Sequence, residues 1–183
     1  MADPEAFNLA LALEYFRRRH PAQSSTVDAF LELSRDRADP FMRARREGHF
    51  TGSAFLVSRD GTRVLLTHHR KLHRWLQLGG HADGDRDLGA VAWREAREES
   101  GLADLTLAPE LFDIDLHEIP ARGEELLHRH FDARFIVHAG SDEAFVVSEE
   151  SHELAWWPVL DVIGDSRFDP SLQRMASRWV RRE

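Results

Sequence analysis

The sequence predicts an α/β sandwich preceded by a helical segment. Strand signals alternate with helix signals over about residues 49–165, and an amphipathic helix at about 87–100 lies among them. Residues 4–47 show helical periodicity instead. A sheet buries its apolar faces when helices cover it, so strands around one long helix, with further helices outside, make a layered α/β fold.

The first 48 residues are expected to form an N-terminal helical extension that packs on the main domain. Apolar residues recur at helical spacing through Ala6–His20, just before a proline. A second helix is expected over about 25–37, because Ser25 and Asp28 have the spacing of a capping box. Three roles for residues 1–48 stay open: they pack on the domain, cover the substrate, or build a homodimer.

Residues 49–183 are expected to form the main domain, which ends in a C-terminal helix. The first hairpin turns at Asp60-Gly61, a strong turn signal between two strand patterns. The expected strands lie at about 51–58, 63–68, 75–78, 105–117, 127–138, 145–147 and 154–157. The C-terminal helix is expected at about 171–182, where apolar residues share one side.

Composition limits the class of protein and its partners. With 183 residues the chain is long enough for one domain with a sizeable core, and it has no cysteine for disulfides or thiolate sites. Its 24 basic and 32 acidic residues give a net charge of −8, which argues against broad binding to DNA or an anionic membrane. The sequence shows neither a signal-peptide pattern nor an apolar run near about 18 residues. We therefore expect a cytoplasmic protein.

The helix at 87–100 ends with three glutamates that a solvated helix would avoid. Glu95, Glu98 and Glu99 have i, i+3 and i+4 spacing, so they share one face. Like charges at this spacing repel, and acids near a helix C-terminus oppose the helix dipole. The alternative is an exposed helix with ion pairs such as Arg94 and Glu98. It does not explain why Glu95 and Glu99 continue the apolar face of the helix, which should point toward the rest of the protein. A divalent cation bound by the three carboxylates would turn their repulsion into attraction.

Residues 80–102, GHADGDRDLGAVAWREAREESGL, resemble the Nudix box. The pattern is a glycine, five residues, a glutamate, seven residues, and then R-E-U-x-E-E-x-G-U, where U is aliphatic. Eight of its nine specified positions fit when Ala96 is accepted as aliphatic, and the exception is Arg86, where the family has glutamate. The order of strands extends the resemblance over about 49–165. The matching positions are Gly80, Arg94, Glu95, Ala96, Glu98, Glu99, Gly101 and Leu102.

The resemblance implies a Nudix-type α/β/α sandwich with a mixed sheet and a hydrolase that depends on Mg²⁺ or Mn²⁺. Such an enzyme cleaves the diphosphate of a nucleoside diphosphate linked to another group, here a nucleotide sugar, ADP-ribose or a similar small nucleotide. The expected metal ligands are Glu95, Glu98 and Glu99, and Arg94 would orient these acids. A metal-bound water would lose its proton to a general base, either Glu95 or Glu149. The expected catalytic set is Glu95, Glu98, Arg94 and Glu149.

Arg86 bears on how the box is held together and on whether the protein turns over substrate. Asp85 and Asp87 flank Arg86, and either could hold Arg94 in place of the family's glutamate. The alternative function is a non-catalytic Nudix-fold sensor module that binds a nucleotide without cleaving it. The intact set of three acids argues against that alternative.

Basic residues before the box are candidates for substrate binding. Arg70 and Lys71 could contact phosphate oxygens, although a solvated loop is an equally good interpretation. Gly80, which lets the backbone approach the site, and His81 complete this part of the expected substrate-binding set.

Two later strands carry polar faces that could form a second feature. On the strand at 127–138, His128, His130, Asp132 and Arg134 alternate with apolar residues. The strand at 105–117 has Asp113, Asp115 and His117 opposite Phe112, Ile114 and Leu116. If the two strands pair, their polar faces join into one patch. Three interpretations stay open: a solvated sheet face, a substrate groove in which His128 and His130 bind substrate, or a second metal site that lacks a clear third ligand.

Overall fold

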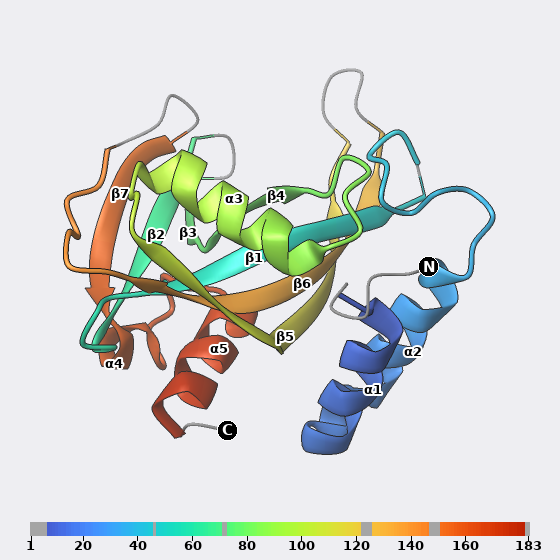
Figure 1. Cartoon of the computed structure of the whole chain (residues 1–183), viewed down its shortest axis with the longest axis horizontal. Coiled ribbons are helices and arrows are strands. Elements are labelled where there is room, and N and C mark those ends of the chain that lie inside the picture. Colours follow the sequence, from blue (N-terminus) through green and yellow to red (C-terminus); the bar gives the residue numbers. More distant parts are fainter. Residues whose placement is uncertain (1–6, 46, 71–72, 122–125, 147–150, 182–183) are drawn as a thin grey trace.

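Figure 1 shows the computed structural model, which describes the chain except for residues 1–6, 46, 71–72, 122–125, 147–150 and 182–183. Its elements in chain order are α1 (Leu9–Arg19), the short 3-10 helix η1 (Pro21–Gln23), α2 (Ser24–Ser34), β1 (His49–Val57), β2 (Arg63–His69), β3 (Arg74–Leu76), β4 (Leu78–His81), α3 (Leu88–Ser100), β5 (Leu105–Ile119), β6 (His128–Ala139), β7 (Ser151–Pro158), α4 (Val159–Val162) and α5 (Pro170–Arg181). No helix in the described ranges is both long and apolar enough to cross a lipid bilayer.

β1 lies at the centre of a seven-stranded mixed sheet. The strand order is β3-β2-β1-β6-β5, with β4 also paired to β1 and β7 to β2. β1 runs parallel to β6 and antiparallel to β2 and β4. All nine residues of β1 are buried, as expected of a central strand covered on both faces.

Helices cover both faces of this sheet, which confirms the predicted α/β/α sandwich with a mixed sheet. β1 divides the core, because alternate side chains point to opposite faces of a strand. Phe50, Ala54 and Leu56 join the apolar cluster that contains α3, whereas Phe55 and Val57 join the cluster that contains α4 and α5. Figure 1 accordingly shows α3 and α5 on opposite sides of the sheet.

The two N-terminal helices pack beside edge strand β5 and reach the main core (Figure 1). The ring of Phe30 in α2 lies 5.3 Å from that of Phe131 and 5.7 Å from that of Phe50, centroid to centroid. The expected capping box is wrong: α2 begins at Ser24, directly after η1, and its N-cap residue makes no side-chain cap hydrogen bond. Asp28 instead accepts a hydrogen bond from Arg17 at 2.7 Å. The division of the chain at residue 48 stays a prediction.

The expected hairpin at Asp60-Gly61 and the helix of the box are confirmed, but the strand expected at 145–147 is wrong. Phe145 and Val146 belong to no strand, and residue 147 lies outside the described residues. The Val146 N–H donates instead to the carbonyl of Ser100 at 2.8 Å, at the C-terminal end of α3. This segment therefore caps a helix end and does not extend the sheet.

A bulge in β5 changes which side chains share a face. Leu111 pairs with Phe135, and Asp113 pairs with the next residue of β6, Arg134, so that two steps on β5 match one on β6. Phe112 consequently packs with Phe55 in the α5 cluster, with ring centroids 5.9 Å apart. The expectation that it shares a face with Ile114 and Leu116 is wrong, because those residues pack in the other cluster, which contains α1, α2 and α3.

Buried charges fasten α5 to the sheet. Arg134 is 2% exposed and donates to Asp132 at 2.7 Å and Asp113 at 3.4 Å. Asp113 is fully buried and also accepts hydrogen bonds from Arg174 at 2.7 Å and Arg178 at 2.6 Å, both on α5. A buried charge that loses its partner is costly, so the carboxylate of Asp113 is the shared acceptor on which three guanidinium groups depend.

We predict that Asp113→Asn lowers the free energy of unfolding by about 3 kcal/mol or more, because it leaves buried guanidinium groups without their shared counter-charge. Urea denaturation of the whole chain measures this change. Asp28→Asn is the matched control, since it removes a carboxylate from an exposed pair with Arg17 and should cost less than about 1 kcal/mol. Equal effects of the two variants would contradict the prediction.

Candidate active site

α3 is fixed at both ends by its own sequence. The side chain of Asp87 accepts a hydrogen bond from the N–H of Ala90 at 2.9 Å and caps the start of the helix. Gly101 ends it in the left-handed conformation, with φ of +72°, and its N–H donates to the carbonyl of Arg97. These two signals set where the helix begins and ends. Its rotation on the sheet is set by its buried side chains, which include Leu88, Val91 and Ala92.

Two of the three expected acids reach the backbone of β4. A carboxylate oxygen of Glu99 accepts a hydrogen bond from the N–H of Gly79 at 3.0 Å. The carboxylate of Glu95 lies against Gly80, where a Cβ atom would come within 2.6 Å of its carboxyl carbon. A side chain at residue 80 would therefore displace this carboxylate from its position against the strand. Glu98 is exposed and lines a shallow hollow beside the helix.

These carboxylates fit a divalent cation of the Mg²⁺ type. Oxygen ligands suit Mg²⁺ and Mn²⁺, and Glu95 and Glu99 converge on neighbouring residues of one strand. Among the described side chains, the oxygens of the three glutamates do not come within 4.8 Å of one another as a set. The assignment of all three as ligands stays a prediction.

Arg94 links Glu95 to the loop that precedes the helix. Its guanidinium group lies 3.3 Å from a carboxylate oxygen of Glu95 and 3.6 Å from one of Asp85, and it donates to the carbonyl of His81 at 3.4 Å. Of the two aspartates expected to hold Arg94, Asp85 makes the contact. Asp87 does not, because its side chain caps the helix.

Arg86 points to the N-terminal segment. Its guanidinium group lies 3.2 Å from a carboxylate oxygen of Asp39 and 4.9 Å from the ring centroid of Phe41. The carbonyl of Phe41 also accepts a hydrogen bond from the N–H of Gly84 at 2.9 Å. The residue that departs from the box pattern therefore attaches the loop of the box to the segment between α2 and β1.

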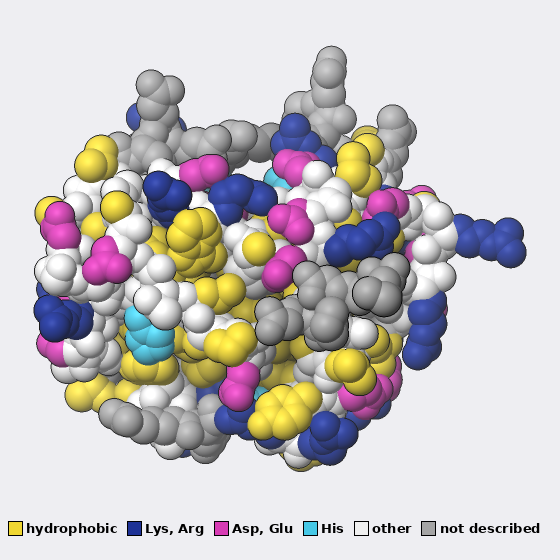
Figure 2. Space-filling view, in the orientation of Figure 1, with side chains coloured by type: hydrophobic (Ala, Val, Ile, Leu, Met, Phe, Trp, Pro, Cys, Tyr) yellow, Lys and Arg dark blue, Asp and Glu magenta, His cyan; other side chains and the backbone are white. Residues whose placement is uncertain are grey.

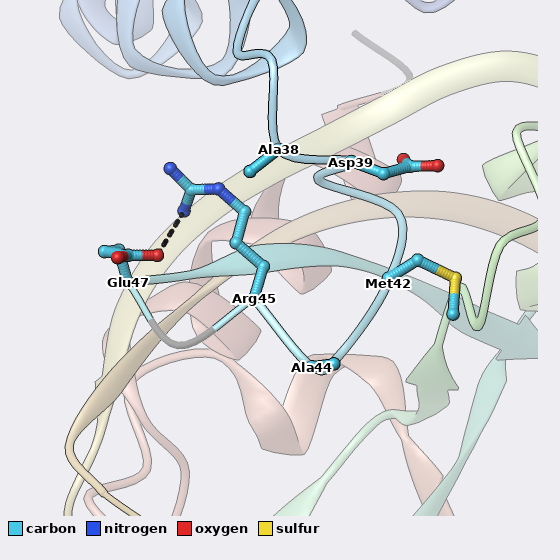
Figure 3. A pocket seen from close by; sticks show the side chains of 6 residues that line it. All are labelled: Ala38, Asp39, Met42, Ala44, Arg45 and Glu47. Carbon is cyan, nitrogen blue, oxygen red and sulfur yellow. Dashed lines mark ion pairs between the residues drawn. The ribbon is translucent and has the colours of Figure 1, made fainter.

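That segment is itself held by Arg45. Figure 3 shows the hollow that it encloses, with Arg45 paired to Glu47 at 3.8 Å. The same guanidinium group lies 2.7 Å from Asp36 and donates to the carbonyl of Gly48 at 2.7 Å. The hollow is lined by Ala38, Asp39, Met42, Ala44, Arg45 and Glu47. These contacts order the chain just before β1, beside the loop of the box.

The polar faces of β5 and β6 join, as predicted for a hairpin. Asp115 pairs with Asp132 and His117 with His130 in the antiparallel register. The face is not a solvated surface, because Asp132 is 2% and His128 is 8% exposed. α5 covers one end of the face, and the other end carries the histidines.

Four histidines gather at that end, and the ring centroid of a fifth, His117, lies 5.6 Å from that of His130. His49 of β1, His81 of β4 and His130 of β6 each offer a ring nitrogen, and these three atoms lie within 4.8 Å of one another. His128 Nε2 lies 3.2 Å from His130 Nε2. Burial, together with neighbouring imidazoles, lowers the pKa of His49 to about 4 and that of His130 to about 2. Both rings are therefore neutral near pH 7, and each keeps one lone-pair nitrogen.

Sequence reasoning missed His49. The signal was present, because alternation through β1 places His49 on the same face as Thr51 and Ser53, whose hydroxyl groups donate to Asp132. What the sequence did not reveal is the parallel register that sets His49 opposite His130.

The expected substrate-binding residues lie in different places. Gly80 and His81 are consecutive in β4 and point to opposite faces, Gly80 toward Glu95 and His81 toward the histidines. Arg70 is exposed and directly follows β2, so it is not part of the strand that carries Gly80 and His81. Lys71 and Glu149 lie outside the described residues, so their roles stay predictions.

Comparison with known proteins shows the family of this chain. The family model described as the NUDIX domain matches residues 49–179. The chain belongs to this family. As a Nudix protein it is a hydrolase of acid anhydrides in phosphorus-containing compounds. The match spans β1 to α5, so it includes the box, the sheet and the histidines.

Solved Nudix structures resemble this chain over most of its length. A NUDIX family hydrolase from Clostridium perfringens is 27% identical, with 73% of this chain and 96% of that one covered and a TM-score of 0.55. A MutT NUDIX hydrolase from Burkholderia pseudomallei is 25% identical, with 70% and 95% covered and a TM-score of 0.52. The E. coli dihydroneopterin triphosphate pyrophosphohydrolase, at 17% identity, 73% and 96% coverage and a TM-score of 0.59, shows likeness of fold alone. A comparison with curated proteins gives no match.

We predict that Gly80→Ala weakens Mg²⁺ binding by about 10-fold or more, because the added methyl group displaces the carboxylate of Glu95. Calorimetric titration with Mg²⁺ measures this effect. Gly79→Ala is the contrasting variant: its methyl group would meet the Cα of Ser53 at 2.8 Å, so it should lower the free energy of unfolding by about 1–3 kcal/mol. A Gly80→Ala protein that binds Mg²⁺ as tightly as the parent would refute the placement of Glu95.

We predict that Arg86→Glu, which restores the family residue, speeds hydrogen exchange at the Gly84 amide. The new carboxylate would face Asp39, and the loss of this exposed contact should cost about 1 kcal/mol or less. Arg86→Lys keeps the charge and is the control. Unchanged exchange at Gly84 in both variants would show that Arg86 does not attach the loop to the N-terminal segment.

Proposed function

We propose that this Nudix protein cleaves, with Mg²⁺ or Mn²⁺, the diphosphate linkage of a nucleoside diphosphate joined to another group, such as a nucleotide sugar or ADP-ribose. The observation that carries the proposal is the seating of Glu95 and Glu99 on the glycines of β4, with Arg94 holding Glu95 from the side. A helix end with this many acids is unfavourable unless a cation offsets them.

The metal ion would be held by Glu95, Glu98 and Glu99. When bound, it supplies positive charge for diphosphate oxygens and lowers the pKa of a bound water. The Gly79 N–H fixes the orientation of the Glu99 carboxylate, and Arg94 fixes that of Glu95. Acids oriented before substrate arrives need little reorganisation during reaction.

Glu95 is the general base that we propose, with Glu149 as the alternative. The side chain of Glu95 is 19% exposed and contacts Arg94, whereas Glu98 is exposed. A base must reach the water whose proton it takes, and a carboxylate that also holds the metal would lie next to a metal-bound water. Glu98, which is exposed, would complete the metal site from the outer side of the helix.

A small anionic substrate fits the charge of the protein better than a long nucleic acid. The net charge is −8, and Figure 2 shows basic and acidic side chains interspersed over the face that carries α3. A metal ion and local arginines such as Arg94 can offset this field at one point. They would not offset it along a polymer backbone.

A hydrolysis screen over nucleotide sugars, ADP-ribose, dinucleoside polyphosphates and nucleoside triphosphates tests the proposal, with and without Mg²⁺. We predict turnover of one substrate class that needs the metal and falls at least about 100-fold in Glu98→Gln and in Glu95→Gln. Glu110→Gln is the control, because Glu110 is an exposed acid on β5 that pairs only peripherally with Arg19.

Two outcomes would overturn this function. Nucleotide binding that needs metal but gives no turnover would indicate the sensor module instead. Turnover that survives in both Glu95→Gln and Glu98→Gln would place the chemistry away from α3.

A further inference from the structure

The histidines form a ligand set that is separate from the carboxylates of the box. Thr51 pairs with His81 across β1 and β4, and His49 pairs with His130 across β1 and β6. Because residues directly opposite one another share a face, the three histidines project to the same side of the sheet. Alternation within β4 puts Gly80 on the other side, against Glu95.

The spacing of the ring nitrogens is close to that of a metal site. One nitrogen from each of His49, His81 and His130 lies within 4.8 Å of the others. Around a tetrahedral zinc ion with Zn–N bonds of about 2.0–2.1 Å, ligand nitrogens are about 3.3 Å apart. The rings would therefore close by at most about 1.5 Å, which small side-chain rotations supply. Among the described residues, this is the one group of three or more metal-ligating side chains with such spacing.

His49 gives an independent reason to place a ligand here. It is 3% exposed, and its Nδ1 lies 3.3 Å from the carbonyl oxygen of Arg45, to which Nδ1–H donates. Its Nε2 is buried with no hydrogen-bond partner among the described residues. An unpaired buried nitrogen is costly, and a ring whose other nitrogen donates to a backbone carbonyl is the usual arrangement of a metal-bound histidine.

His128 lies next to these three histidines, and its Nδ1 also contacts a backbone carbonyl. Its Nδ1 lies 2.9 Å from the carbonyl oxygen of Leu126, which leaves Nε2 as an acceptor. That Nε2 accepts a hydrogen bond from the Nε2–H of His130 at 3.2 Å. Two nitrogen ligands of one tetrahedral zinc ion are about 3.3 Å apart, so an ion that replaces this proton needs little movement of the rings. His128 is 8% exposed, so it too is largely removed from water.

We propose that His49, His81 and His130 bind a transition-metal ion of the Zn²⁺ class, with His128 placed as a fourth ligand. Imidazole nitrogen favours zinc and its neighbours over Mg²⁺, which prefers the oxygens on the other side of β4. The ion would cross-link β1, β4 and β6 at the first residues of the box. An ion that binds the folded chain but not the unfolded chain stabilises the fold. We therefore assign it a structural role: it would hold in place the strand that Glu95 and Glu99 contact.

Zinc titration of the whole, chelator-treated chain in excess Mg²⁺ tests this proposal. Mg²⁺ occupies carboxylate sites, so calorimetry should report one equivalent of Zn²⁺ in the parent protein and in Glu98→Gln. His49→Gln and His130→Gln should bind Zn²⁺ at least about 100-fold more weakly. His138→Gln is the matched control, because His138 lies on the same strand but packs on Trp179, with ring centroids 5.8 Å apart.

Cobalt gives a second measurement that does not depend on the variants. Co²⁺ in a tetrahedral nitrogen site absorbs visible light far more strongly than Co²⁺ held by carboxylates and water, so the parent protein should develop this absorption with one equivalent of metal. The proposal is overturned if the parent protein takes up no Zn²⁺ and gives no such spectrum. It is equally overturned if His49→Gln binds as the parent does while Glu98→Gln loses the site.

Discussion

The close approach of α3 to β1 and β4 is the constraint on which the site depends. A Cβ atom at Gly52 would lie 2.6 Å from the carbonyl oxygen of Leu88, and one at Gly80 would lie 2.6 Å from the carboxylate of Glu95. Without side chains at these two positions, the helix lies directly on the strands. Its carboxylates then reach the strand backbone, as the Glu99 contact to the Gly79 N–H shows. The rotation that makes this contact is fixed by the buried face of the helix, which includes Leu88, Val91 and Ala92.

The pleat of β4 divides the chemistry of the protein between two faces. Gly80 faces the oxygen ligands of α3, whereas His81 faces nitrogen ligands from β1 and β6. Hard and softer divalent cations prefer these two donor types, so one short strand separates two kinds of ligand set. On the histidine face, Asp115 contacts both His117 and Arg134, which links the cluster to the charges that fasten α5. Arg86, in the loop between β4 and α3, also contacts Asp39 in the segment between α2 and β1.

Local sequence signals predicted the fold well and the histidine cluster poorly. The Asp60-Gly61 turn and the periodicity of the box helix depend on a few neighbouring residues, so each could be recognised without the structure. Sequence reasoning missed the cap made by Asp87, because the same residue is a possible partner of Arg94. The Asp and His face of β5 and β6 followed from alternation. His49 escaped because its partners are distant in sequence and depend on a parallel register. The bulge before Asp113 was likewise invisible, since it arises only when two strands pair.

Paramagnetic broadening by Mn²⁺, followed in backbone amide NMR spectra, tests the division between the two faces most directly. Mn²⁺ prefers oxygen ligands, so substoichiometric Mn²⁺ should broaden the amides of Gly79, Gly80 and the last turns of α3 first. The amides of His49 and His130, whose side chains point to the other face of the sheet, should broaden later and less. Broadening centred on His49 and His130, with the end of α3 unaffected, would contradict the assignment of the hard-cation site to the box acids.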